Sequence, residues 1–296
     1  MRAIVVGGSG HIGELLVAEL QGAGHSVVAT FATTPLPGGI RYDIGSDRPE
    51  MVFPSLNSGD VVYLLAAVSH PDAVLLDPAR AMRVNVIGAI DLLNFVYKRG
   101  ARAVFVSSVE VFDGEKFRYN EMDVANPLNV YGLTKWRIED YMSRNLPADR
   151  FTIIRTCWNI GPTLGSRCVV RLTYEALLLP EARMATDNSF SVISSIDTAR
   201  IMAQVGTLNP GPPQVIHLAG DTEVIRSELA RRILDVSQRS AQMAFSDTTF
   251  SQLVFREPRG RMTVLDNSLS KSAVGATYAD SWNVIDEKIR LLDGSK

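Results

Sequence analysis

A tyrosine and a lysine stand four positions apart in this 296-residue chain, as Tyr131 and Lys135. On a helix, residues four apart lie on one face, with about 5–6 Å between their Cβ atoms. An ammonium group at that distance favours the phenolate, so Lys135 should lower the pKa of Tyr131 from about 10. Such a tyrosine can give or take a proton near neutral pH, as reduction of a carbonyl group requires. The pair alone does not decide function, because a surface helix can carry both residues by chance.

Two serines precede this pair and stand at the end of a predicted strand. The apolar run 103–107 ends at Ser107, and Ser108 follows it. A helix is predicted over about 131–144, and it carries the Tyr–Lys pair. A hydroxyl group beside an acid–base tyrosine can stabilise charge that develops on a reacting oxygen. The elements that surround these residues decide whether they form one site.

Short apolar runs alternate with helical patterns over the first 160 residues. Helices are predicted where apolar residues recur every three to four positions, and buried strands where apolar runs are short and unbroken. The predicted strands are 3–6, 26–31, 61–67, 103–107 and 151–156, and the predicted helices are 12–20, 79–99 and 131–144. This alternation is typical of βαβ units with right-handed crossovers. The predicted fold class is therefore α/β, with a doubly wound parallel Rossmann sheet.

The pattern loosens after residue 160. Residues 192–198 and 214–218 are predicted as late strands that return to the sheet. Further on, residues 227–237 have helical spacing and residues 259–265 are predicted to form a strand. The last part of the chain should therefore build a smaller lobe of mixed helices and strands.

No Pro- or Ser-rich linker separates the two parts of the chain. We expect a dinucleotide-binding Rossmann domain over residues 1–160, with returning strands at about 190–220. Residues 161–296 should form an interleaved, smaller α/β lobe that binds the substrate. Because strands of the second part return to the first, the two parts should not be joined by a simple hinge.

A glycine-rich turn follows the first predicted strand. Gly7, Gly10 and Gly13 fit the spacing G-x-x-G-x-x-G, with His11 and Ile12 between the last two. Glycine lets the backbone turn tightly and approach a pyrophosphate, and the helix that follows offers free N–H groups to it. In its strand–turn–helix context this motif predicts a dinucleotide site. His11 should contribute a backbone or phosphate contact, or else be an exposed loop histidine.

The end of the second predicted strand bears on the choice of cofactor. An acidic residue about 20 positions after the glycines normally holds the ribose 2′-hydroxyl of NAD. Here no Asp or Glu stands between Glu19 and Asp43, so no carboxylate would repel a 2′-phosphate. The sequence therefore favours NADPH, with NADH as the alternative, although no arginine stands at the strand end. Asp43 and Ile44 could reach the adenine from a short loop, or Asp43 could simply form a turn.

Composition excludes several function classes. The 30 basic and 32 acidic residues give a net charge of −2, and no Lys/Arg-rich run suggests nucleic acid as a partner. The four histidines are scattered and no metal-ligand spacing is present, so no metal site is predicted. The two cysteines, Cys157 and Cys168, are expected to be reduced.

No membrane attachment is predicted. The longest apolar stretch, 61–68, is far shorter than the roughly 20 residues that a membrane span needs. The first residues contain too short an apolar run for a signal peptide. The expected location is therefore the cytoplasm.

Several motifs together resemble the extended short-chain dehydrogenase/reductase superfamily, and within it most closely the dTDP-4-dehydrorhamnose reductases, the sugar-nucleotide-binding group. The resemblance covers nearly the whole chain. Its most specific motifs are Val-Phe-Asp-Gly at 111–114, Asn-Glu-Met-Asp at 120–123, Pro-Leu-Asn-Val-Tyr-Gly at 127–132 and Thr-Lys at 134–135. Softer ones are Arg-Thr-Cys-Trp at 155–158, Ile-His-Leu-Ala-Gly at 216–220 and Leu-Asp-Asn-Ser at 265–268.

The resemblance implies a role for each residue of the central motifs. Tyr131 would donate a proton to the substrate's carbonyl oxygen, and Lys135 would hold the nicotinamide ribose. Ser108 falls where the family has a Thr or Ser that hydrogen-bonds the carbonyl. Ser107 would line the cofactor pocket, and Trp158 matches a tryptophan beside the sugar.

Other matched positions support the cofactor and the substrate nucleotide. Ala66 and Ala67 fall at the strand end that runs under the cofactor. Asn85 falls at a helix position that orders this region, although a solvated helix asparagine would look the same in sequence. Arg259 and Thr263 fall where the family reaches the nucleotide's phosphates, and a plain surface arginine is the alternative.

Two departures from the family pattern bear on the reaction. Val109 stands where sugar-nucleotide 4,6-dehydratases carry an acidic residue, and its isopropyl group cannot transfer protons. Dehydratase activity is therefore disfavoured, even with Glu110 next to it. Gly260 replaces a family proline near the substrate nucleotide, which leaves the nucleotide and the sugar undetermined.

The resemblance implies a reductase of a keto group in a nucleotide-linked deoxysugar, with the nucleotide-sugar as its partner and a homodimer as a possible assembly. A nucleotide-sugar epimerase that retains NAD is one alternative. A non-catalytic, nucleotide-binding regulatory subunit is another, since the beta subunit of methionine adenosyltransferase resembles the same group. The intact set of Ser108, Tyr131 and Lys135 favours a catalytic protein.

Overall fold

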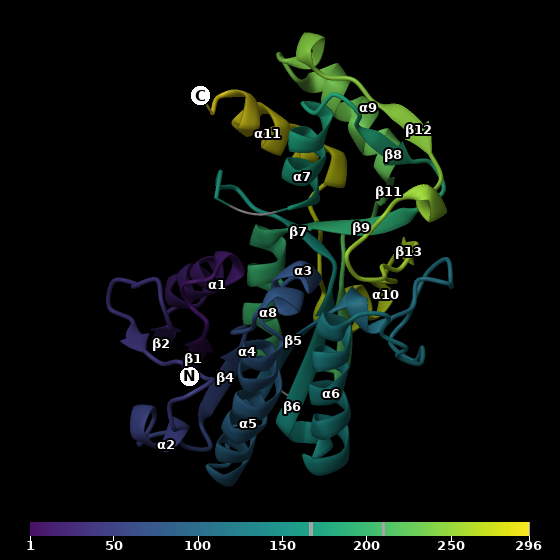
Figure 1. The fold of residues 1–296 in the computed structure, drawn as a ribbon. Coiled ribbons are helices and arrows are strands. Elements are labelled where there is room, and N and C mark those ends of the chain that lie inside the picture. Colours follow the sequence, from purple (N-terminus) through teal and green to yellow (C-terminus); the bar gives the residue numbers. More distant parts are fainter. Residues whose placement is uncertain (166–167, 209–210, 296) are drawn as a thin grey trace.

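A computed structural model describes residues 1–165, 168–208 and 211–295 of the chain (Figure 1). Its centre is a seven-stranded sheet of parallel strands in the order β10-β6-β5-β4-β1-β2-β3. The strands are β1 (Arg2–Val6), β2 (Ser26–Phe31), β3 (Ile40–Arg41), β4 (Asp60–Leu64), β5 (Arg102–Ser108), β6 (Phe151–Thr156) and β10 (Val215–Leu218). The predicted doubly wound Rossmann fold is confirmed.

The central strands are covered on both faces. Every residue of β4 and β6 is buried, as expected for strands in the middle of a parallel sheet. One face packs against α5 (Ala89–Lys98) and α6 (Val130–Asn145). The other face packs against α1 (His11–Gly22) and α8 (Ser195–Thr207). Since all these strands point the same way, their carboxyl ends lie at one edge of the sheet.

Shorter helices complete the first part of the molecule. They are α2 (Pro49–Val52), α3 (Pro71–Leu76), α4 (Pro78–Met82), the π-helical turn η1 (Arg83–Gly88), η2 (Val109–Val111) and η3 (Ala148–Arg150). The single helix predicted over 79–99 is thus built from α4, η1 and α5. A π-helical turn inside a longer helix is uncommon and is frequent at functional sites.

The second lobe lies beyond the carboxyl ends of the sheet, at the top of Figure 1. Its strands are β7 (Trp158–Ile160), β8 (Arg183–Ala185), β9 (Ser189–Ser194), β11 (Glu223–Ile225), β12 (Ser246–Thr248) and β13 (Met262–Thr263). Its helical segments are α7 (Val169–Leu177), α9 (Arg226–Val236), η4 (Ser240–Gln242), η5 (Phe250–Gln252) and α11 (Ser281–Asp293). The helix α10 (Ser268–Val274) packs instead beside β10 and α8 of the main sheet. Side chains of α7, α9 and α11 pack on β9 in a separate core.

The structure corrects one strand and confirms another. The prediction that residues 192–198 return to the main sheet is wrong, because β9 pairs with β7, β11 and β13, and residues from 195 onward are helical. Residues 215–218 do return, as β10 beside β6. Periodicity marks a buried strand but cannot say which sheet it joins.

No helix in the described ranges is long and apolar enough to cross a membrane.

The main sheet has a hydrophobic core on each face, under each of its two helical layers. Strand pairing and these two cores hold the carboxyl ends of β1, β4, β5 and β6 in fixed register. These strand ends carry the residues of the candidate site.

Candidate functional site

A cleft of about 710 Å³ runs along the carboxyl ends of the central strands. It is lined by the glycine-rich turn, the ends of β2, β4, β5 and β6, the first turns of α6, and Arg259 from the second lobe. Nearly all residues predicted from the sequence line it: Gly7, Gly10, His11, Ile12, Gly13, Asp43, Ile44, Ala66, Ala67, Ser107, Ser108, Tyr131, Lys135, Trp158 and Arg259. Asn85 and Thr263 are the predicted residues that are not among the lining residues.

The glycine-rich turn is built so closely that side chains do not fit. Gly7 has a φ of +93°, and a Cβ there would lie 2.7 Å from the backbone nitrogen of Ala66. A Cβ on Gly13 would lie 2.2 Å from the carbonyl oxygen of Gly7. The Gly7 N–H donates to Thr30 Oγ1 at 3.2 Å, which ties the turn to β2. The amino end of α1 thereby lines the cleft as an anion-binding terminus would.

His11 links this turn to the other part of the molecule. Its Nε2 lies 2.7 Å from Ser195 Oγ, at the start of α8. Burial and the nearby charge of Lys288 lower the pKa of His11. The histidine is half-buried, so the alternative of an exposed loop histidine is wrong.

The end of β2 presents Ala32 and Thr33 to the cleft and no carboxylate. Asp43 also lines the cleft, and its Oδ1 accepts a hydrogen bond from the Gly45 N–H at 3.0 Å. Asp43 therefore forms a turn, which was one of its two sequence interpretations, while still facing the cleft. A basic residue that the sequence did not single out, Arg80 of α4, lines the same cleft.

Asn85 supports the cleft from behind. It lies in the π-helical turn η1 and is 3% exposed, so the alternative of a solvated asparagine is wrong. Its Oδ1 accepts from the Val68 N–H at 2.7 Å, and its Nδ2 donates to Val68 O at 3.0 Å and to Thr134 Oγ1 at 3.2 Å. One side chain thus fixes the segment after β4 against α6.

The start of α6 is held against η2. Asn129 caps the helix, since its Oδ1 accepts from the Gly132 N–H at 2.8 Å. A Cβ on Gly132 would lie 2.0 Å from the carbonyl oxygen of Glu110, so only glycine allows this approach. The contact places Tyr131 beside the end of β5, where Ser108 stands.

Tyr131 and Lys135 lie on one face of α6, as the spacing predicted. The Lys135 Nζ is 5.8 Å from the centre of the Tyr131 ring, and it donates to the Val106 carbonyl at 2.8 Å. Lys135 is 4% exposed, and burial lowers its pKa to about 8, opposed by the charge of Glu139.

The expected direction of the Tyr131 pKa is wrong. Burial raises the pKa of Tyr131, the nearby charge of Glu110 raises it further, and a hydrogen bond with Ser108 opposes the rise. The sequence argument counted the ammonium one helical turn away but not the loss of solvation, which disfavours the phenolate more strongly. In this structure Tyr131 is therefore held in its protonated form.

Charged residues cross the cleft where Arg259 reaches it from the second lobe. Arg259 is 17% exposed, so the plain surface arginine is wrong. Its Nη2 lies 3.2 Å from Asp72 Oδ1, and its Nη1 lies 3.9 Å from Glu110 Oε1. Trp158 lines the cleft with its ring centre 6.5 Å from that of His70. Thr263, in contrast, is buried in β13 and is not among the lining residues.

Glu110 and His70 are cleft residues that the sequence did not propose as site residues. Asn129 Nδ2 donates to Glu110 Oε2 at 2.6 Å, and burial raises the pKa of Glu110. His70 has a φ of +81°, the only positive φ at a non-glycine position in the described part of the chain. Strain of this kind persists where surrounding structure imposes it, often at functional sites. For Glu110, the only feature of the sequence that pointed to the cleft was its position close after the serine pair.

Val109 is buried next to the site, and the two cysteines are not bonded to each other. Val109 is 5% exposed and packs with Phe112 and Leu265, as an apolar side chain should. Cys157 and Cys168 are both free thiols. Within residues 1–165, 168–208 and 211–295, no group of three or more His, Cys, Asp or Glu side chains could hold a metal ion.

One family model matches almost the whole chain. The family model described as the RmlD substrate binding domain matches residues 1–288. The chain is 26% identical over 276 residues to the spore coat polysaccharide biosynthesis protein SpsK of Bacillus subtilis, covering 92% of this chain and 91% of that protein. It is 29% identical over 288 residues to a dTDP-4-keto-6-deoxy-D-glucose reductase of Streptomyces niveus, covering 95% and 93%.

Solved structures agree with the fold. A crystal structure of a dTDP-4-dehydrorhamnose reductase from Clostridium acetobutylicum superposes with a TM-score of 0.82. The match covers 99% of each chain at 22% sequence identity. At this identity the likeness establishes the architecture and leaves the chemistry to the residues of the cleft.

Proposed function

Because this chain belongs to the RmlD substrate binding domain family, within the extended short-chain dehydrogenase/reductase superfamily, we propose that it reduces a keto group of a nucleotide-linked deoxysugar with NADPH. The family resemblance seen in the sequence is confirmed, and so is the class of enzyme, an NAD(P)-dependent oxidoreductase. The sugar substrate, the preference for NADPH and the role of Tyr131 are parts of the proposal.

One observation carries the proposal: a dinucleotide-type turn and an acid–base triad line the same cleft. Gly7 and Gly13 leave no room for side chains, as close approach to a pyrophosphate requires. Ser108, Tyr131 and Lys135 line that cleft at the end of β5 and the start of α6. The residues present therefore fit a nicotinamide dinucleotide.

The mechanism assigns one task to each side chain. Lys135 and the glycine-rich turn would hold the cofactor, which when bound supplies a hydride to the carbonyl carbon. The protonated Tyr131 gives its phenolic proton to the carbonyl oxygen and regains one from solvent. Ser108 hydrogen-bonds the same oxygen and stabilises the negative charge that develops on it. Burial keeps Tyr131 protonated, and the alkoxide that hydride transfer leaves on the carbonyl oxygen is basic enough to take its proton.

Two features support NADPH over NADH. The end of β2 has no carboxylate that would repel a 2′-phosphate. Arg80 lines the cleft, and Val84, one helical turn later, packs on Gly45 beside the Asp43 turn. Arg80 thus stands at the end of the cleft where the adenosine would lie, and an arginine there can pair with a phosphate.

Arg80→Ala tests this part of the proposal. An exposed ion pair is worth up to about 1 kcal/mol, so the dissociation constant for NADPH should rise about fivefold, while that for NADH stays nearly unchanged. Fluorescence titration of each nucleotide measures both constants. Arg83→Ala, on the same helical segment but outside the cleft, is the matched control. Equal effects on NADH and NADPH would contradict the assignment.

We also propose a division of labour between the two parts of the chain. Residues 1–160 with β10 would bind the cofactor, and residues 161–296 would supply the substrate side through Arg259. Trp158 stands at the border between them and would lie beside the sugar. Arg259 would reach the phosphates of the nucleotide, which requires its present pairing with Asp72 to loosen.

A substrate panel tests the whole proposal. Oxidation of NADPH and NADH would be followed with dTDP-, UDP- and GDP-linked 4-keto sugars. Turnover that needs added NADPH supports a reductase. Isomerisation of a nucleotide-sugar with retained NAD and no added reductant would instead identify an epimerase. Tight nucleotide binding without turnover of any keto sugar, together with a co-purifying enzyme, would identify a regulatory subunit.

A further inference from the structure

A buried ion pair lies directly behind the acid–base face of α6. Arg155 of β6 donates from Nη2 to Glu139 Oε2 at 2.7 Å, and from Nε to the same carboxylate at 3.0 and 3.2 Å. The two side chains are only 8% and 5% exposed. A buried charge is costly unless it is paired and hydrogen-bonded, so this carboxylate is held strictly in place.

Glu139 connects this pair to the cleft. It follows Lys135 by one helical turn on α6, and its charge opposes the effect of burial on the pKa of Lys135. Its Oε1 also accepts a hydrogen bond from Ser107 Oγ, and both Ser107 and Lys135 line the cleft. Glu139 itself does not line the cleft, so any effect that it has on the chemistry passes through these two residues.

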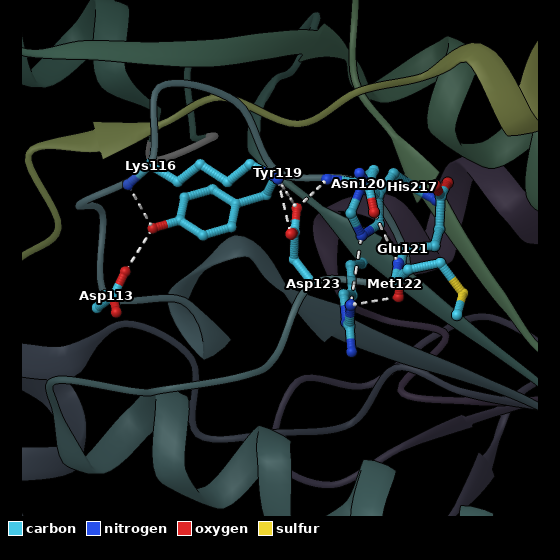
Figure 2. A network of polar contacts seen from close by, with 9 residues as sticks. Asp113, Lys116, Tyr119, Asn120, Glu121, Met122, Asp123 and His217 are labelled. Atoms are coloured by element: carbon cyan, nitrogen blue, oxygen red, sulfur yellow. Dashed lines mark hydrogen bonds and ion pairs between the residues drawn. The ribbon is translucent and has the colours of Figure 1, made fainter.

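Arg155 is fixed from the opposite side by the segment 113–123. Its Nη1 donates to the Glu121 carbonyl at 3.4 Å, while Glu121 Oε1 accepts from the His217 N–H at 2.9 Å. Figure 2 shows this segment, with Glu121 turned towards His217 of β10. The guanidinium also lies 5.0 Å from the centre of the Phe112 ring. Arg155 therefore has partners besides Glu139 that hold it in place.

The segment itself is tightly pinned, so it forms a firm backing. In Figure 2 the Tyr119 hydroxyl donates to Asp113, and Lys116 and Asp123 form an ion pair whose Nζ–Oδ1 distance is 2.7 Å. Asp123 Oδ2 also accepts from the Asn120 N–H at 2.7 Å. The segment that carries Glu121 is thus held on both sides of this residue.

Lys135 is surrounded by groups from α6, β5 and β6. Tyr131 and Glu139 stand on its own helix, β5 presents the Val106 carbonyl and the Phe105 ring, and β6 presents Arg155 beyond Glu139. Of these, Glu139 carries the negative charge that favours the ammonium form. Arg155 carries a second positive charge that Glu139 compensates.

We propose that Glu139 is a positioning residue for Lys135: its carboxylate, fixed by Arg155 and Ser107, keeps the lysine charged and aimed at the Val106 carbonyl and the cleft. This inference rests on the proposed function, in which charged Lys135 holds the cofactor. A purely structural ion pair would stabilise the fold without affecting how cofactor binding depends on pH.

The test measures the dissociation constant of NADPH by fluorescence from pH 6 to pH 10, so it needs no substrate. A lysine is charged below its pKa, so affinity in the unaltered protein should fall above about pH 8. Glu139→Gln keeps the shape but leaves Arg155 uncompensated, so this fall should begin at least one pH unit lower. At pH 8.5 a one-unit shift lowers the charged fraction from roughly a quarter to roughly 3%, or about eightfold weaker binding.

Two further variants test the direction in which the pH profile of NADPH binding moves. Arg155→Gln removes the cation that competes with Lys135 for Glu139, so the fall in NADPH affinity should move to higher pH. Glu139→Asp keeps the charge and should restore most of the original profile. Asp140→Asn is the matched control, because Asp140 neighbours Glu139 on α6 but pairs with Arg144 in solvent, and it should leave the profile unchanged.

The outcomes separate this inference from the proposed function. No binding of NADPH by the unaltered protein would contradict the proposed function. Normal binding, with the same pH profile in Glu139→Gln as in the unaltered protein, would overturn the role of Glu139 alone. If Glu139→Gln does not fold by circular dichroism, the upward shift in Arg155→Gln decides, and loss of folding in all three variants would assign the pair a structural role only.

Discussion

Tyr131 shows why a proton donor cannot be judged from its nearest charged neighbour. The sequence places an ammonium one turn away, yet burial and Glu110 hold the phenol in its protonated form. Lys135 is itself buried, with a pKa lowered to about 8, so its charge is not guaranteed either. The balance between solvation and charge, rather than the Tyr-x-x-x-Lys spacing, sets the acid–base state of the pair.

Tyr131→Phe should remove the proton donor without disturbing the fold. General acid catalysis contributes about 10²–10⁴-fold, so turnover of the keto sugar should fall by that factor while NADPH affinity stays within about twofold. Steady-state kinetics and nucleotide titration measure the two quantities. Tyr141→Phe is the control on the same helix, because its hydroxyl contacts Asn94, and it should leave turnover unchanged. Unimpaired turnover in Tyr131→Phe would refute the assigned role.

His217 gives a prediction about acid stability. It is fully buried, and burial together with Arg155 lowers its pKa to about 3 from 6.5. The unfolded chain takes up a proton below pH 6.5 that the folded chain does not, so stability falls as pH drops from about 6.5 towards 3. At pH 5 this single group should cost about 2 kcal/mol of unfolding free energy. Urea unfolding at pH 7 and pH 5 measures the loss, and His217→Gln should reduce it.

At the scale of elements, the site depends on three close backbone approaches. The turn of Gly7 touches the segment after β4, α6 touches η2 at Gly132, and Gly114 touches Gly260 of the second lobe. A Cβ on Gly114, which has a φ of +75°, would lie 2.4 Å from Gly260 Cα. A Cβ on Gly260 would in turn lie 3.1 Å from Gly114 Cα, a tight approach that favours glycine at 260, where the resemblance led us to expect proline.

Gly13→Ala should distort the nucleotide turn. The added Cβ would lie 2.2 Å from the Gly7 carbonyl oxygen, so the turn must open and NADPH affinity should fall at least tenfold. Gly22→Ala, at the other end of α1, meets nothing within 4 Å and should be neutral or stabilise by about 0.5–1 kcal/mol. Thermal unfolding and NADPH titration of both variants test this. Unchanged NADPH affinity and thermal stability in Gly13→Ala would contradict the tight turn.

At the scale of the whole molecule, the two parts are interleaved rather than linked in series. β9 belongs to the second lobe, yet α8 begins at the next residue and packs on α1 against the main sheet. The chain then returns to the main sheet as β10. Neither part can unfold without removing elements from the other.

The molecule should therefore unfold in one cooperative thermal transition. NADPH at a hundred times its dissociation constant adds about 2.7 kcal/mol, and this should raise the single transition by a few degrees. Differential scanning calorimetry with and without NADPH measures both. Two separate transitions, of which NADPH moves only one, would contradict the interleaving.

The cytoplasmic location and the homodimer remain predictions from the sequence.

The sequence by itself determined the features that local chemistry dictates. Unbroken apolar runs, helical periodicity and the glycine spacing were enough for a doubly wound sheet with a nucleotide turn, because these patterns depend on burial and on backbone freedom alone. The same local patterns placed the Ser-Ser and Tyr-x-x-x-Lys residues at the ends of neighbouring elements. Fifteen of the seventeen predicted site positions line the cleft, while Asn85 orders it from behind and Thr263 is buried in β13.

Only the tertiary structure decided what depends on residues far apart in the chain. It assigned β9 to a second sheet, joined Arg259 to Asp72, and set Glu139 and Arg155 behind Lys135. It also reversed the direction expected for the Tyr131 pKa. The physical reason is common to all of these: strand partners, buried ion pairs and loss of solvation are properties of packed neighbours, and no local pattern records them.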